Sequence, residues 1–162
     1  MKKVIIYTAR GNPGPGGYGA VLIHTGEKKE ISEGYKLTTN NRMELMACIA
    51  GLQTLKYSYS VVIYTDSRYI ADSMEKGWVR KWEAQNWKRN KKDKAENVDL
   101  WEKLLNLCTK HKVKFEWIKG HSGIRENERC DELANKAVSN KELKEDTNYI
   151  NNNTTFSQPH LF

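Results

Sequence analysis

The stretch SVVIYTD, residues 60–66, decides the fold class. Its nearly continuous run of β-branched and apolar residues predicts a strand that is buried on both faces, as strands are at the centre of α/β sheets. Asp66 follows this run directly, at the carboxyl end of the strand, where such sheets present their ligands. The stretch therefore predicts a central strand that ends in a candidate functional group.

The sequence on either side predicts the rest of a mixed sheet. Three runs that suit strands lie close together before residue 37, which predicts an antiparallel meander. Polar capping residues, TTNN at 38–41, precede an apolar stripe at helical spacing that extends to about Lys56. The element order predicts an α/β (mixed α+β) fold, a five-stranded mixed sheet flanked by helices. The other strands are predicted over residues 3–8, 18–24, 29–36 and 113–118, and the other helices over 67–76, 78–82, 98–111 and 126–139.

The composition is that of one globular domain. The chain has 162 residues and a mean hydropathy of −0.77, and a chain of this length buries roughly 70% of its unfolded surface. No apolar run approaches the ~20 residues of a membrane span, and the apolar run near the N-terminus is too short for a signal peptide. The three scattered cysteines form neither a disulfide framework nor a zinc pattern. We expect a reduced, cytoplasmic protein with a domain over residues 1–149 and a disordered polar tail over residues 150–162.

Positive charge is concentrated in residues 76–94. The net charge of the whole chain is +7, and this segment holds eight lysines and arginines against two acids, together with three of the five tryptophans. Basic side chains reach phosphates and aromatic faces stack on sugars or bases, so the segment favours a nucleic-acid partner. The alternative is a solvated basic helix whose tryptophans pack inward.

Three acids fall where a carboxylate is costly to bury unless it is paired or bound to a metal. They are Glu44, early in a predicted helix, Asp66, and Asp131 in the last predicted helix. Converging carboxylates suit a hard divalent cation, Mg²⁺ or Mn²⁺, and with the basic segment they favour two-metal phosphodiester chemistry. Structural interpretations stay open: Glu44 serves a helix dipole, and Asp66 caps the helix that begins at Ser67. Asp131 would then pair with Arg129.

Five blocks of sequence closely resemble type 1 bacterial ribonuclease H, in order and at the expected spacing over roughly residues 1–149. They are GNPGPGGYGAVL (11–22), TTNNRMELMA (38–47), YTDSRYI (64–70), NVDLW (97–101) and KGHSGIRENERCDELA (119–134). The resemblance implies a ribonuclease H-like fold and an endonuclease that hydrolyses the RNA strand of RNA·DNA hybrids, leaving 5′-phosphate and 3′-hydroxyl ends. In that family, four acids in the order Asp, Glu, Asp, Asp bind two Mg²⁺ ions, for which Mn²⁺ can substitute.

The resemblance also implies roles for individual residues. Glu44, Asp66 and Asp131 match the last three acids and are expected metal ligands and catalytic residues, and His121 matches a mobile histidine that assists proton transfer or product release. Arg68 stands where relatives often have glutamine. The expected hybrid-binding residues include the minor-groove contacts, a residue of a phosphate pocket and members of the basic protrusion: Asn12, Thr39, Asn40, Asn41, Trp78, Trp82, Lys88 and Arg89.

The first acid of the family pattern is missing. Where the family has Thr-Asp-Gly-x-x-x-Gly-Asn-Pro-Gly, this chain has TARGNPG at residues 8–14, three residues fewer, and its first acid is Glu27. We expect the two-metal site to be impaired and the rate to fall on the order of a thousandfold or more. The alternative is a catalytically silent hybrid-binding protein. Three explanations of the missing triplet stay open. It was removed deliberately, it was lost naturally, or it is missing from the recorded sequence rather than from the molecule.

The shortening also has structural consequences. A first strand that slips by an odd number of residues presents its side chains to the wrong face of the sheet. A shorter connection to the second strand also favours exchange of the first strand between two chains. We expect a monomer, with a strand-swapped dimer as the alternative.

The last five residues, QPHLF, resemble the Gln-x-x-Leu-Phe peptide by which bacterial replication proteins dock on the sliding clamp. Gln158, Leu161 and Phe162 occupy the positions of that pattern. A polar tether that ends in two apolar anchors suits docking into a pocket of a partner, and the alternative is a chance hydrophobic end. The resemblance implies a partner in DNA replication.

Overall fold

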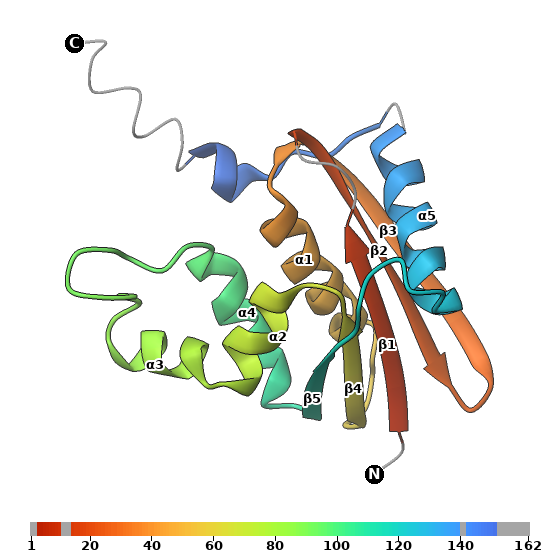
Figure 1. Ribbon diagram of the computed structural model, residues 1–162, viewed down its shortest axis with the longest axis horizontal. Helices are drawn as coiled ribbons and strands as arrows, with labels where there is room; N and C mark the ends of the chain where they lie inside the picture. The colour runs from red at the N-terminus through yellow and green to blue at the C-terminus, as the bar shows by residue number, and fades with distance from the viewer. Residues whose placement is uncertain (1–2, 11–13, 140–141, 152–162) are drawn as a thin grey trace.

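The computed structural model describes residues 3–10, 14–139 and 142–151. Its five-stranded sheet has the order β3-β2-β1-β4-β5, in which β1, β2 and β3 are antiparallel neighbours and β1, β4 and β5 are parallel neighbours (Figure 1). The predicted mixed sheet and its meander are therefore confirmed. The strands are β1 Lys3–Arg10, β2 Gly14–His24, β3 Glu27–Thr38, β4 Ser60–Thr65 and β5 Lys112–Trp117.

All of the predicted helices form. The first ends three residues before Lys56, because Thr54 caps it and donates its hydroxyl to the Ala50 carbonyl at 2.9 Å. No helix in the described part of the chain is long and apolar enough to cross a membrane. The helices are α1 Asn40–Gln53, α2 Arg68–Glu75, α3 Trp78–Ala84, α4 Val98–Cys108 and α5 Arg125–Ser139.

Helix α5 covers one face of the sheet, and it lies unusually close to the strands (Figure 1). At Gly17 and Gly19 of β2 and Gly34 of β3, a Cβ atom would collide with backbone carbonyl oxygens of α5. Only glycine leaves room for this approach, because any other residue would push the helix off the sheet. The glycines therefore hold α5, and with it Asp131, against the strands.

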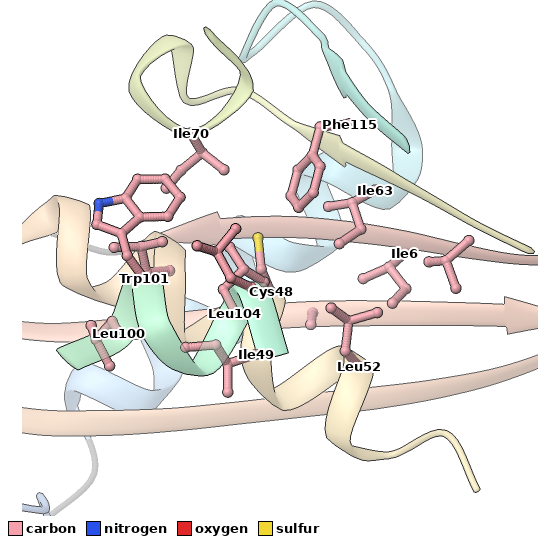
Figure 2. Close-up of a cluster of buried hydrophobic side chains, with 14 of the residues drawn as sticks. Ile6, Cys48, Ile49, Leu52, Ile63, Ile70, Leu100, Trp101, Leu104 and Phe115 are labelled. Atoms are coloured by element: carbon pink, nitrogen blue, oxygen red, sulfur yellow. The ribbon is translucent and has the colours of Figure 1, made fainter. Parts of the chain in front are cut away.

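Helices α1 and α4 pack over the other face. Figure 2 shows Ile6 of β1, Ile63 of β4 and Phe115 of β5 meeting side chains from these helices and from α2. Trp101 of α4, which is fully buried, closes the cluster and donates its indole N–H to the Tyr69 hydroxyl at 2.9 Å. The large core on this side fixes α1 relative to β1 and β4.

A segment after α5 ties the start of α1 to the edge of the sheet. Lys144 forms a parallel bridge with Tyr35 of β3, and residues 147–151 form a helical turn. Between them, the Asp146 carboxylate accepts hydrogen bonds from the Thr38 hydroxyl and from the buried Arg42 guanidinium of α1, at 2.7 and 2.6 Å. Residues 150 and 151, which were expected to belong to the polar tail, lie in this helical turn. The rest of the expected tail, residues 152–162, lies outside the described part.

Candidate active site

Glu44 is the point where α1 meets the two central strands. Its side chain is fully buried, and its Oε1 accepts hydrogen bonds from the hydroxyls of Thr8 on β1 and Thr65 on β4, at 2.5 and 2.7 Å. Because Glu44 is the fifth residue of α1, beyond the first turn that senses the helix dipole, the dipole interpretation is wrong. Two hydroxyls orient this carboxylate instead.

Asp66 lies at the carboxyl end of β4, as predicted. Ser67, not Asp66, is the N-cap of α2, since its hydroxyl accepts from the Ile70 N–H at 3.2 Å. The capping interpretation of Asp66 is therefore wrong. Gly120, in the loop after β5, packs closely against the Asp66 side chain: a Cβ on Gly120 would lie 2.9 Å from Asp66 Oδ2. The Trp117 indole N–H also donates to the Asp66 carbonyl at 3.2 Å.

Asp131 of α5 faces His121 across a gap. His121 Nδ1 lies 3.8 Å from Asp131 Oδ2, beyond hydrogen-bonding distance, and the His121 side chain is 86% exposed. Arg129 binds Glu30 at 2.6 Å and Glu132 at 2.9 Å, so the proposed structural pairing of Arg129 with Asp131 is wrong. An exposed imidazole close to a partly buried carboxylate suits proton exchange with solvent or substrate.

The register of β1 fixes where the missing acid would stand. Thr8 is paired with Thr65 of β4, so the next positions along the two parallel strands are Ala9 and Asp66. Pairing with β2 is continuous from Ile5 to Arg10. Val4 and Ile6 are buried in the core and Thr8 contacts Glu44, so the strand has not slipped onto the wrong face. By the alternation of strand positions, an acid placed directly after Thr8 would share the sheet face with Tyr7, the face covered by α5.

The three candidate acids do not form a metal site on their own. Among the described residues, no group of three or more His, Cys, Asp or Glu side chains is arranged to hold a metal ion. The donor set that the resemblance implies needs a fourth carboxylate, and this chain has no acid before Glu27. The residues present therefore do not fit a resident pair of metal ions.

The expected hybrid-binding residues occupy two places. Thr39 is the N-cap of α1, its hydroxyl accepting from the Arg42 N–H at 3.2 Å, and Asn40 and Asn41 form the first turn. The Asn40 Oδ1 is buried and has no hydrogen-bond partner among the described residues. Asn12 lies outside the described residues, as do the tail residues Gln158, Leu161 and Phe162.

The second place is the basic segment, which projects beside the sheet as α3 and the loop after it (Figure 1). Lys88 and Arg89 are exposed and line an open hollow of about 440 Å³ together with Lys81 and Lys91. Trp78 is exposed, whereas Trp82 packs edge-on against Trp101, with ring centroids 6.4 Å apart. The inward-packing alternative thus describes Trp82, while the lysines and Arg89 offer a cationic surface.

Comparison with known proteins decides the family. Residues 1–139 match the RNase H family. This chain belongs to the RNase H family. The ribonuclease H of Rippkaea orientalis is 56% identical over 153 residues, 93% of this chain and 94% of that protein, and the ribonuclease H of Trichodesmium erythraeum is 57% identical over 150 residues, 91% and 96%.

Solved RNase H structures share the fold. LC9-RNase H1, a type 1 RNase H with the type 2 active-site motif, superposes with a TM-score of 0.76 at 31% identity, covering 86% of this chain and 73% of that one. LC11-RNase H1, solved in complex with an RNA/DNA hybrid, superposes with a TM-score of 0.64 at 26% identity, covering 84% and 96%. The ribonuclease H-like fold expected from the sequence is confirmed.

Proposed function

We propose that this chain binds RNA·DNA hybrids as a ribonuclease H and that its hydrolysis of the RNA strand is impaired by the missing aspartate after Thr8. The observation that carries the proposal is the unslipped register of β1. Thr8, Thr65 and Glu44 are in contact, while the position beside Asp66 on β1 holds Ala9. The scaffold of the site is intact, and one carboxylate is absent from it.

Family membership and the cationic surface support hybrid binding. LC11-RNase H1 was solved with an RNA/DNA hybrid, and its fold matches over 84% of this chain. The hollow beside Lys88 and Arg89 offers positive charge to a polyanion. The first turn of α1 offers the amides of Asn40 and Asn41, which suit the sugar and base edges of a shallow minor groove.

The resemblance assigns hydrolysis to two Mg²⁺ ions on four acids, for which Mn²⁺ can substitute. Glu44, Asp66 and Asp131 supply three of these carboxylates, and the exposed imidazole of His121 lies at the edge of the site, where it would exchange a proton with solvent or substrate. Without the fourth carboxylate, the ions and the attacking water are not held in place. Such a loss lowers the rate on the order of a thousandfold or more.

A catalytically silent hybrid-binding protein is the second candidate, and the Ala9 position favours it. Both candidates predict tighter binding to an RNA·DNA hybrid than to a DNA duplex of the same sequence. They differ in residual cleavage: an impaired nuclease cuts an end-labelled RNA strand slowly in Mg²⁺ or Mn²⁺, and a silent one does not cut it.

Fluorescence anisotropy with the hybrid, the DNA duplex and the RNA duplex, followed by a cleavage assay on the same hybrid, tests the proposal. The expected result is preferential binding of the hybrid with slow or no cleavage. Equal affinity for all three duplexes would contradict hybrid recognition. Rapid cleavage, at a rate equal to that of the Rippkaea orientalis relative, would contradict impairment.

We further propose that the tail docks on a replication sliding clamp. The support is the QPHLF pattern at residues 158–162 together with the position of its tether, which follows the helical turn at residues 147–151. A pull-down with purified clamp should retain the full chain and lose a chain that ends at Ser157. Equal retention of the two chains would contradict docking through Gln158, Leu161 and Phe162.

A further inference from the structure

An arginine is stacked on an indole at the edge of the candidate active site. The Arg68 guanidinium carbon lies 3.8 Å from the centroid of the Trp117 ring, a close cation–π contact. Arg68 begins α2, and Trp117 ends β5. The Trp117 side chain is 38% exposed, and Arg68 is exposed, so the pair lies at the surface.

The pair is fixed to the backbone of Asp66. The Trp117 indole N–H donates to the Asp66 carbonyl at 3.2 Å, so the ring cannot rotate without breaking this hydrogen bond. Arg68 follows Asp66 by two residues and is stacked on the same ring. The guanidinium is therefore held beside the strand end that carries the candidate catalytic carboxylate.

No carboxylate among the described residues pairs with Arg68. Its side chain makes no ion pair or hydrogen bond with another described residue, whereas Arg42 and Arg129 each bind two carboxylates. The contact holds the guanidinium group over the ring, and Arg68 is an exposed residue, so its N–H donors can reach a ligand. The planar fork of guanidinium donors matches two oxygens of a phosphate.

We infer that Arg68, held on Trp117, binds a backbone phosphate of the RNA·DNA hybrid next to the scissile site. The inference rests on the proposed function. It gives this chain a charged contact at a position where relatives often have glutamine, which can bind a ribose or a base edge but cannot neutralise a phosphate. The contact needs no metal ion, so it contributes to binding in EDTA.

Neutralising Arg68 tests the contact through the salt dependence of binding. Each phosphate neutralised contributes a slope of about 0.9 to the plot of log Kd against log salt concentration. For Arg68→Gln we expect about five- to tenfold weaker hybrid binding in EDTA at low salt, and a slope reduced by about 0.9. Arg68→Lys, which keeps the charge but not the planar fork, should recover the slope and part of the affinity.

Lys29→Gln is the matched control, because it removes the same charge from an exposed residue of β3. Lys29 pairs with Leu22 near the β2–β3 turn, at the end of the sheet away from Asp66. The control should bind as the unchanged chain does. If Arg68→Gln matches Lys29→Gln in both affinity and slope while the unchanged chain prefers the hybrid, the Arg68 contact is wrong and the proposed function stands. If the unchanged chain shows no preference for the hybrid, the proposed function itself fails.

Discussion

Two buried charged residues of α1, Arg42 and Glu44, lie two positions apart and differ in the kind of group that binds them. Arg42 donates through all five of its guanidinium N–H groups, to both carboxylate oxygens of Asp99, both of Asp146 and the amide oxygen of Asn97, at 2.6 to 3.4 Å. Glu44 accepts from two threonine hydroxyls. The described partners of Arg42 include two carboxylates, and those of Glu44 include two threonine hydroxyls that orient it.

The difference separates a structural cluster from a functional one. Two carboxylates from α4 and the C-terminal segment complement Arg42, so its charge serves to join three parts of the chain. Two threonine hydroxyls on neighbouring strands orient the Glu44 carboxylate. A carboxylate oriented in this way at the carboxyl ends of β1 and β4, where Asp66 follows Thr65, suits a site that needs one more carboxylate to hold cations.

The largest expected effect comes from breaking the Arg42 cluster. Arg42→Met leaves the buried Asp146 and the partly buried Asp99 without their cation, and we expect the free energy of unfolding to fall by about 3–5 kcal/mol in urea titrations. Glu44→Gln keeps an oxygen to accept from the two hydroxyls, so we expect its cost to be about 1 kcal/mol or less. Equal losses for the two variants would erase the distinction between the clusters.

The hydroxyls that orient Glu44 should contribute a smaller amount. Thr65→Val keeps the shape of the side chain but removes a donor to Glu44 and the acceptor for the Ser67 N–H, at 3.0 Å. Losing one of the two hydroxyl donors to Glu44, together with the acceptor for the Ser67 N–H, should lower the free energy of unfolding by about 2 kcal/mol. Serine at the same position restores the hydroxyl and is the control; a loss from Thr65→Ser as large as that from Thr65→Val would point to packing instead.

The smallest effect is a pH dependence carried by Asp99. Burial disfavours the Asp99 carboxylate, but hydrogen bonds and the charge of Arg42 outweigh it and lower the pKa of Asp99. Because the folded pKa lies below the unfolded one, this stabilisation is present above the unfolded pKa, about 3.9, and is lost as the pH falls through the folded pKa. Urea titrations between pH 7 and pH 3 should show a shallower loss for Asp99→Asn than for the unchanged chain. If the free energies of unfolding of the two chains fall in parallel with pH, Asp99 does not contribute to this pH dependence.

Local patterns predicted most of the scaffold. The strand at residues 60–65 was predicted with its observed ends, because polar residues on both sides of a short apolar run mark where the strand begins and ends. The first two strands are longer than predicted, since pairing to β2 and β3 extends them past the apolar positions, to Arg10 and back to Gly14. Asp66 and Glu44 were found because acids stood out among residues bound for the core.

Contacts between distant parts of the chain were not predictable in this way. Asp99 and Asp146 stand 57 and 104 residues after Arg42, and nothing in the local pattern around Arg42 marks it as buried. The Arg68–Trp117 stack likewise depends on α2 and β5 meeting at the edge of the sheet. Such pairs follow from tertiary packing, which sequence periodicity does not encode.

The most direct test of the account is cleavage of an end-labelled RNA strand, annealed to DNA, by the chain with Asp-Gly-Ala inserted after Thr8. This insertion restores the family spacing and places a carboxylate beside Asp66, and a chain with Asn-Gly-Ala inserted there restores the length alone. We predict that in Mg²⁺ only the Asp-Gly-Ala chain cleaves efficiently, on the order of a thousandfold or more faster than the unchanged chain. Comparable cleavage by the unchanged chain, or equal rescue by the Asn-Gly-Ala chain, would contradict the claim that one missing carboxylate disables the site.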